Sequence, residues 1–165
     1  MSTRGAWGIK KGDKIIVQYN HFDSYPTGLG ERIVEDLNEW KKDAPEEWIK
    51  RLGEVLEEVE VINEEENPEA TEEQIKYCND WGCKYNDDNK ECYFVLHSLQ
   101  GDVLSYLKGF KYFLNAGEEW LNDGLFCEWS YIFNLDKKTL EINGVSYPIS
   151  ELSVDLMKRI EEERG

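Results

Sequence analysis

The chain has 165 residues, of which 35 are acidic and 19 basic, so its formal charge is −16. This length suits one hydrophobic core, and we expect a single domain over residues 1–165. The acidity argues against direct binding to nucleic acid, because Lys and Arg supply the affinity for phosphates. It favours a protein partner with a basic surface, although solubility alone could also explain it.

Hydropathy excludes two further classes of protein. No apolar run approaches the roughly 18 residues that a membrane helix needs, and residues 1–8 lack the apolar segment of a signal peptide. We therefore expect a cytoplasmic protein with no membrane association. Aromatic residues make up 13% of the chain, which argues against a disordered protein.

The chain begins with the pattern of a β-hairpin. Residues 7–10 and 14–19 read as strands, and Gly12 lies in the turn between them. The polar segment 20–30 follows, and a helix after it carries apolar residues at positions 33, 34, 37 and 40. A second helix is predicted over residues 45–59, with Pro45 in its first turn.

The middle of the chain continues with a third predicted helix. Thr71 and Gln74 form a capping-box pattern that opens this helix through Tyr77 and Trp81. Residues 91–97 predict a strand. Apolar residues at helical spacing predict a further helix over residues 102–113, which ends before Gly117.

The last part of the chain again reads as strands, at residues 125–135, 139–142 and 145–149, with a turn at Asn143–Gly144 and a terminal helix over 154–164. Regular βαβ alternation is absent, which disfavours a parallel sheet. We predict an α+β fold, in which N- and C-terminal hairpins form one antiparallel sheet and helices from the middle pack on it. The N-terminal hairpin should pair with the strand over residues 126–135.

An acidic block lies between residues 54 and 73, where ten Glu occur without any Lys or Arg. Such a block is commonly a solvated face or a loop. It is also a candidate surface for a basic partner, and the candidate binding residues are Glu57, Glu58, Glu64, Glu65 and Glu66.

Three cysteines and a histidine, at Cys78, Cys83, Cys92 and His97, could supply four zinc ligands. However, Cys92 and His97 are five residues apart on a predicted strand, so their side chains should point to opposite faces. The alternative is a set of reduced thiols in the core. We therefore expect no metal and no other cofactor.

The polar segment 20–30 offers a second candidate for chemistry. His21 and Asp23 would share a face of an extended chain, where a histidine beside a carboxylate can act as a general base. Turn formation alone could also explain these residue types. In that structural alternative, Asp23 should be at least half-buried and should accept hydrogen bonds from the backbone or from Arg4.

Removal of Met1 would leave Ser2 with a free α-amine, as in N-terminal nucleophile hydrolases. The catalytic alternative thus comprises Ser2, Arg4, His21 and Asp23. We find no further group that would complete this set, and no phosphate-binding loop.

Three motifs resemble those of an uncharacterised family of small bacterial and phage proteins. They are MxTRG at residues 1–5, YNHFDSYPxGLG at 19–30 and LFCEWxY at 125–131. No activity is assigned to this family. The resemblance implies that the 20–30 loop and the strand after residue 125 share one structural centre. Similar proteins often have Gly at position 2 and generally lack the three central cysteines. The candidate binding residues at this centre are Asn20, His21, Asp23, Tyr25 and Glu128.

Two function hypotheses follow. The first is an acidic, non-enzymatic interaction protein, in its sharpest form a phage-derived inhibitor of a host defence or nucleic-acid-processing protein, such as an anti-CRISPR-like protein or a DNA mimic. The alternative is a small hydrolase or small-ligand-binding protein that uses the 20–30 loop. A closed polar pocket at this loop would favour chemistry, whereas a filled centre beneath a negative surface would favour binding.

Overall fold

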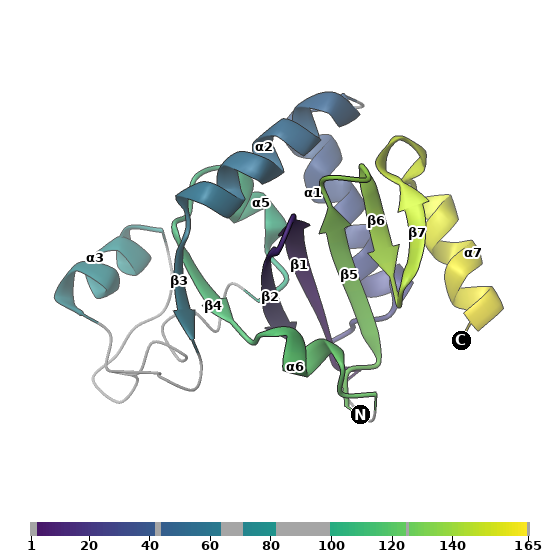
Figure 1. Cartoon of the computed structure of the whole chain (residues 1–165), viewed down its shortest axis with the longest axis horizontal. Helices are drawn as coiled ribbons and strands as arrows, with labels where there is room; N and C mark the ends of the chain where they lie inside the picture. Colours follow the sequence, from purple (N-terminus) through teal and green to yellow (C-terminus); the bar gives the residue numbers. More distant parts are fainter. Residues whose placement is uncertain (1–2, 42–43, 64–70, 82–99, 125, 165) are drawn as a thin grey trace.

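The computed structural model describes residues 3–41, 44–63, 71–81, 100–124 and 126–164. Its main sheet has the strand order β2-β1-β5-β6-β7, so strands from both ends of the chain share one sheet (Figure 1). This confirms the α+β class and the predicted pairing of the N-terminal hairpin with the aromatic strand. The strands are β1 (Gly5–Lys11), β2 (Lys14–Asn20), β5 (Trp129–Asn134), β6 (Thr139–Ile142) and β7 (Val145–Pro148).

The sheet is not wholly antiparallel, because β1 and β5 run in the same direction. Parallel neighbours need a long crossover between them, and the segment of the chain between β2 and β5 supplies it here. The expectation of an antiparallel sheet was therefore wrong for this central pair and right for the other three. The predicted turn at Asn143–Gly144 is confirmed, and both residues have the positive φ values, 49° and 83°, that such turns favour.

Helices α1 (Glu31–Lys41), α2 (Pro45–Glu58), α5 (Val103–Leu107) and α7 (Val154–Arg164) cover one face of the sheet, which we call the inner face. In Figure 1, α1 passes behind the sheet and α6 (Glu118–Leu121) lies in front of it. The inner face carries the main core, in which β1 and β5 contribute Trp7, Ile9, Tyr131 and Phe133. The alternating residues on the outer face form a smaller cluster beneath α6, which contains Ala6, Val17, Ile132, Trp120 and Leu121.

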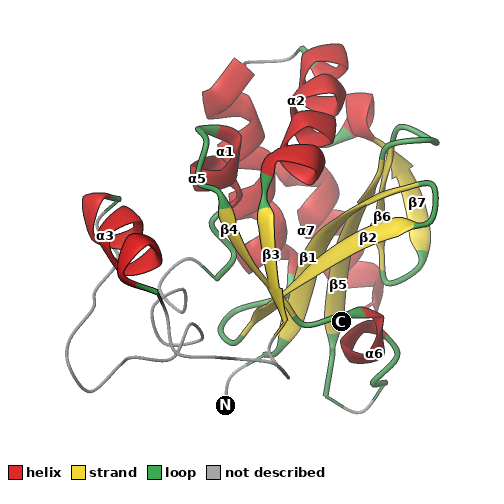
Figure 2. Cartoon of the chain, turned by 60° about the vertical axis from the view of Figure 1, so that its left-hand side comes forward, coloured by secondary structure: helices red, strands yellow, loops and turns green. Residues whose placement is uncertain are grey.

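Helix α3 (Glu72–Asp80) begins with the predicted capping box between Thr71 and Gln74. Figure 2 shows α3 at the periphery, away from the main sheet. The aromatic rings of Tyr77 and Phe110 lie 5.4 Å apart and connect α3 to the segment after α5.

The predicted helix over residues 102–113 was wrong in its second half. Helix α5 ends at Leu107, and Gly109 has a φ of 116° that a helix cannot contain. The chain then forms β4 (Tyr112–Asn115), which pairs in parallel with β3 (Glu60–Asn63), a strand that the sequence did not predict. Phe110 and Phe113 are nevertheless buried, so their spacing reflected burial rather than helix. The predicted strand at 91–97 lies outside the described residues.

Within the described residues, no helix is both long enough and apolar enough to cross a membrane.

Candidate functional site

All three sequence motifs meet at one end of the main sheet. Gly5, the first residue of β1, pairs with Asn20 at the end of β2 and with Trp129 at the start of β5. The backbone of Glu128 donates to the carbonyl of Arg4 at 2.9 Å, and the Glu128 carboxylate accepts from the Arg4 amide at 3.1 Å. We call this region, residues 3–5, 19–30 and 126–131, the motif end.

The centre of the motif end is filled by buried polar side chains. Asn20 donates to the Ser24 hydroxyl at 2.8 Å and to the Phe22 carbonyl at 2.7 Å. The Tyr131 hydroxyl donates to the Ser24 carbonyl at 2.7 Å. Burial raises the pKa of Tyr131 far above its ordinary value, so this hydroxyl remains a neutral donor. These bonds confirm the predicted coupling between the 20–30 loop and the strand after residue 125.

Gly5 is required by the close approach of these segments. A Cβ atom at this position would collide with the Trp129 carbonyl on one side and with the Ser24 side chain on the other. The three motif segments are therefore in van der Waals contact, and the centre of the motif end is solid.

The prediction that Asp23 is buried was wrong. Asp23 is exposed and has a left-handed φ of 51°, a conformation that Asp tolerates better than most residues. Its carbonyl accepts from Leu29 N at 2.8 Å, so its backbone stabilises the loop. Its carboxylate interacts with Tyr25, whose pKa is raised chiefly by the Asp23 charge.

His21 has a different partner from the one expected. Its Nδ1 atom lies 2.6 Å from the Tyr19 hydroxyl, and its ring meets Phe22 edge-on with centroids 4.5 Å apart. His21 and Asp23 thus interact with separate tyrosines rather than with one another. The histidine–carboxylate pair that could act as a general base is therefore not assembled. Ser2, the nucleophile of the catalytic alternative, lies outside the described residues.

Two exposed phenylalanines at the motif end were missed by the sequence analysis. Phe22 is 61% exposed and Phe126 is 48% exposed. The Arg4 guanidinium lies 5.6 Å from the centroid of the Phe126 ring. Each phenylalanine stood within a motif that was interpreted through its polar residues, and neither belonged to a periodic apolar pattern.

The other candidate residues are dispersed. Glu57 and Glu58 are exposed at the end of α2, and Glu58 pairs with Arg51 at 3.2 Å. Cys78 is fully buried in the core. The described residues contain no cluster of potential metal ligands. The remaining residues of the two candidate sets, Glu64, Glu65, Glu66, Cys83, Cys92 and His97, lie outside the described part of the chain.

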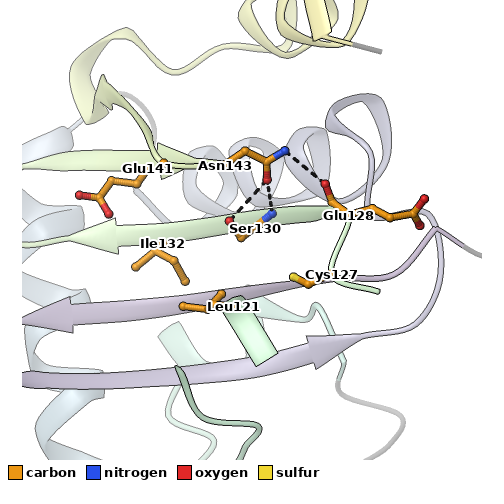
Figure 3. A pocket seen from close by; sticks show the side chains of 8 residues that line it. Leu121, Cys127, Glu128, Ser130, Ile132, Glu141 and Asn143 are labelled. Carbon is orange, nitrogen blue, oxygen red and sulfur yellow. Dashed lines mark hydrogen bonds between the residues drawn. The ribbon is translucent and has the colours of Figure 1, made fainter. Parts of the chain in front are cut away.

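A hollow of about 390 Å³ lies on the outer face of the sheet, beside the motif end (Figure 3). Two hydrogen bonds lie within its lining: Ser130 N donates to Asn143 Oδ1 at 2.8 Å, and Asn143 Nδ2 donates to the Glu128 carbonyl at 3.2 Å. Burial raises the pKa of the Cys127 thiol to about 11, so this thiol stays protonated. The hollow is lined by Leu121, Cys127, Glu128, Ser130, Ile132, Glu141, Asn143 and Gly144.

No protein-family model matches this chain, and no curated protein or solved structure has significant similarity to it.

Proposed function

We propose that this chain is a non-enzymatic interaction protein that docks a partner with a basic surface at its motif end. The observation that supports this most is that polar side chains at the motif end are buried, whereas two apolar side chains there are exposed. The polar groups of Asn20, Ser24 and Tyr131 bond to one another inside the structure. The apolar rings of Phe22 and Phe126 face solvent.

Exposed aromatic side chains are the residues that most often anchor protein interfaces, because they bury a large area with little loss of conformational freedom. A solid centre leaves no room for a substrate among Asn20, Ser24 and Tyr131. Both features favour docking over chemistry at the 20–30 loop.

The partner's charge follows from that of the chain. A net charge of −16 attracts a basic surface and repels an acidic one, and long-range attraction raises the association rate. In its sharpest form, the proposal makes this chain an acidic inhibitor of a host defence or nucleic-acid-processing protein. It would then occupy a basic surface that otherwise contacts phosphates.

The test compares partner capture by the wild type and the double variant F22S/F126S in extracts of the source cells. Val61→Ser is the matched control, because Val61 is 38% exposed and lies on β3 rather than at the motif end. We expect wild type and control to retain the same basic protein and the double variant to lose it, with unchanged circular dichroism. Equal retention by a folded double variant would refute docking through the motif end.

A further inference from the structure

The hollow beside the motif end combines an apolar floor with acidic ends. Ile132 and Leu121 provide apolar surface, and Glu141 and Glu128 lie at opposite ends (Figure 3). Neither Lys nor Arg is among the lining residues. Within the described part of the chain, neither Glu128 nor Glu141 belongs to an ion pair.

Glu141 is held in place but keeps capacity for a ligand. It lies directly opposite Ile132 in the β5–β6 pair, and its Oε1 accepts from Asn134 Nδ2 at 3.1 Å. A carboxylate offers about four acceptor positions on its two oxygens, so one such bond leaves room for a donor from a ligand. Ser130 N and the Asn143 amide are paired within the hollow, and the Glu128 carboxylate, which accepts one bond from Arg4 N, and the Glu141 carboxylate are the charged groups of its lining.

This chemistry suits a long side chain with an apolar stem and a cationic head. The stem of an arginine can lie along apolar surface while its planar head donates two parallel hydrogen bonds to a carboxylate. The volume, about 390 Å³, lies at the lower end of the range for ligand pockets and is large enough to admit one long side chain. Cys127 and Glu128 directly follow Phe126 in the chain, so the hollow adjoins the docking surface.

We infer that the hollow is a recognition pocket for an arginine side chain of the basic partner. This inference rests on the proposed function for the source of the arginine, and it names the group that the partner inserts. The arginine enters from the motif end past Glu128, its stem covers Ile132 and Leu121, and its guanidinium pairs with Glu141.

The pocket can be tested without the partner, by NMR titration of the ¹⁵N-labelled protein with N-acetyl-arginine amide. The backbone amides of Ser130, Asn143 and Gly144 should shift and saturate, with a Kd on the order of millimolar. N-acetyl-citrulline amide has the same shape without the charge and should not bind. Saturable binding of both probes, or unsaturable shifts spread over the surface, would overturn the inference.

Charge-neutralising variants locate the interaction. Glu141→Gln keeps an acceptor for Asn134 and should weaken binding of the arginine probe by about twofold to fivefold, as should Glu128→Gln. Glu163→Gln removes the same charge from an exposed position on α7 and should leave the Kd unchanged. Equal losses in E141Q and E163Q would show a general charge effect and no pocket.

The outcomes separate this inference from the proposed function. If the probe does not bind while F22S/F126S still loses the partner, the pocket is wrong and the docking surface stands. If the probe binds and the phenylalanines prove irrelevant to capture, the proposed function fails and the pocket is a site for free arginine-like ligands. A partner arginine whose replacement by Lys leaves the affinity unchanged would contradict bidentate recognition.

Discussion

Among single residues, Tyr131 joins the 20–30 loop to β5, because its hydroxyl donates a hydrogen bond to the Ser24 carbonyl. Tyr131→Phe would leave the buried Ser24 carbonyl without this donor, at an expected cost of about 1–3 kcal/mol in unfolding free energy. Tyr147→Phe is the control, since Tyr147 is only partly buried and its hydroxyl makes no hydrogen bond among the described residues. Urea unfolding of both variants measures the difference, and equal costs would contradict this role.

Asp36 should make the free energy of unfolding depend on pH. Burial raises the pKa of this carboxyl to about 6, and the charges of Asp102 and Glu39 add to the effect, while the bond from Leu104 N and the charge of Arg32 oppose it. The folded state therefore binds this proton more tightly than the unfolded state, whose pKa is about 3.9. The stability that the proton contributes is present at low pH and is lost as the pH rises through 6.

Asp36→Asn should consequently have a higher melting temperature than wild type at pH 7.5 and a flatter dependence on pH between 4 and 6.5. The amide keeps an oxygen to accept from Leu104 N. Glu35→Gln, at an exposed position on the same helix, is the control and should follow the wild type. Parallel melting curves for wild type and D36N across this range would show that Asp36 is not strained by burial.

At the scale of elements, the start of β1 is fixed by contact on two sides. Gly5→Ala would push a methyl group into the Trp129 carbonyl and the Ser24 side chain, and overpacking of this kind costs about 1–3 kcal/mol. Gly53→Ala on α2 is the control, because its Cβ would meet only Leu135 at 3.7 Å. That variant should be more stable by about 0.5–1 kcal/mol, since Ala favours helix over Gly. Chemical denaturation that shows similar effects at both positions would contradict the close approach at Gly5.

The elements that were predicted correctly share a local cause. The N-terminal hairpin, the α3 capping box and the Asn143–Gly144 turn depend on residues a few positions apart. The β3–β4 pair was missed because it joins strands that are about fifty residues apart, and four-residue strands carry little periodicity. The pairing of β1 with β5 was predicted, but its parallel direction was not, because the direction depends on how the long segment between the two strands crosses the sheet.

The candidate site divides in the same way. The polar residues of the sequence showed which segments form the candidate site. They did not show which side chains of those segments are exposed to solvent. Asp23 and Phe22 are adjacent in the chain, and the left-handed turn at Asp23 sends both side chains to solvent. Sequence alone assigned one to the interior and ignored the other, because exposure here depends on a backbone angle and on segments far away in the chain.

At the scale of the whole molecule, the negative charge should act on the rate of association. Glu57→Lys reverses an exposed charge near the end of α2, and it should slow binding to a basic partner at 0.05 M salt. The effect should shrink toward 1 M salt, where the Debye length is about 3 Å. On-rates from surface plasmon resonance measure this, and Glu151→Lys, an exposed position beside the β5–β6 turn, is the control for total charge. Equal slowing by both reversals would mean that only net charge matters and that the α2 end is not near the interface.

The position of β1 between β2 and β5 also determines how this chain can be made. Strand β1 leaves the ribosome just before β2, its neighbour on one side, but its other neighbour, β5, is synthesised more than a hundred residues later. Until then, the edge of β1 that pairs with β5 has no partner strand, which is a state prone to wrong pairing. Contacts so distant in sequence also slow folding, because the loop must close before they form. The central pair of the sheet therefore makes completion of the core a late event in synthesis, and the nascent hairpin is the segment that chaperones would have to protect.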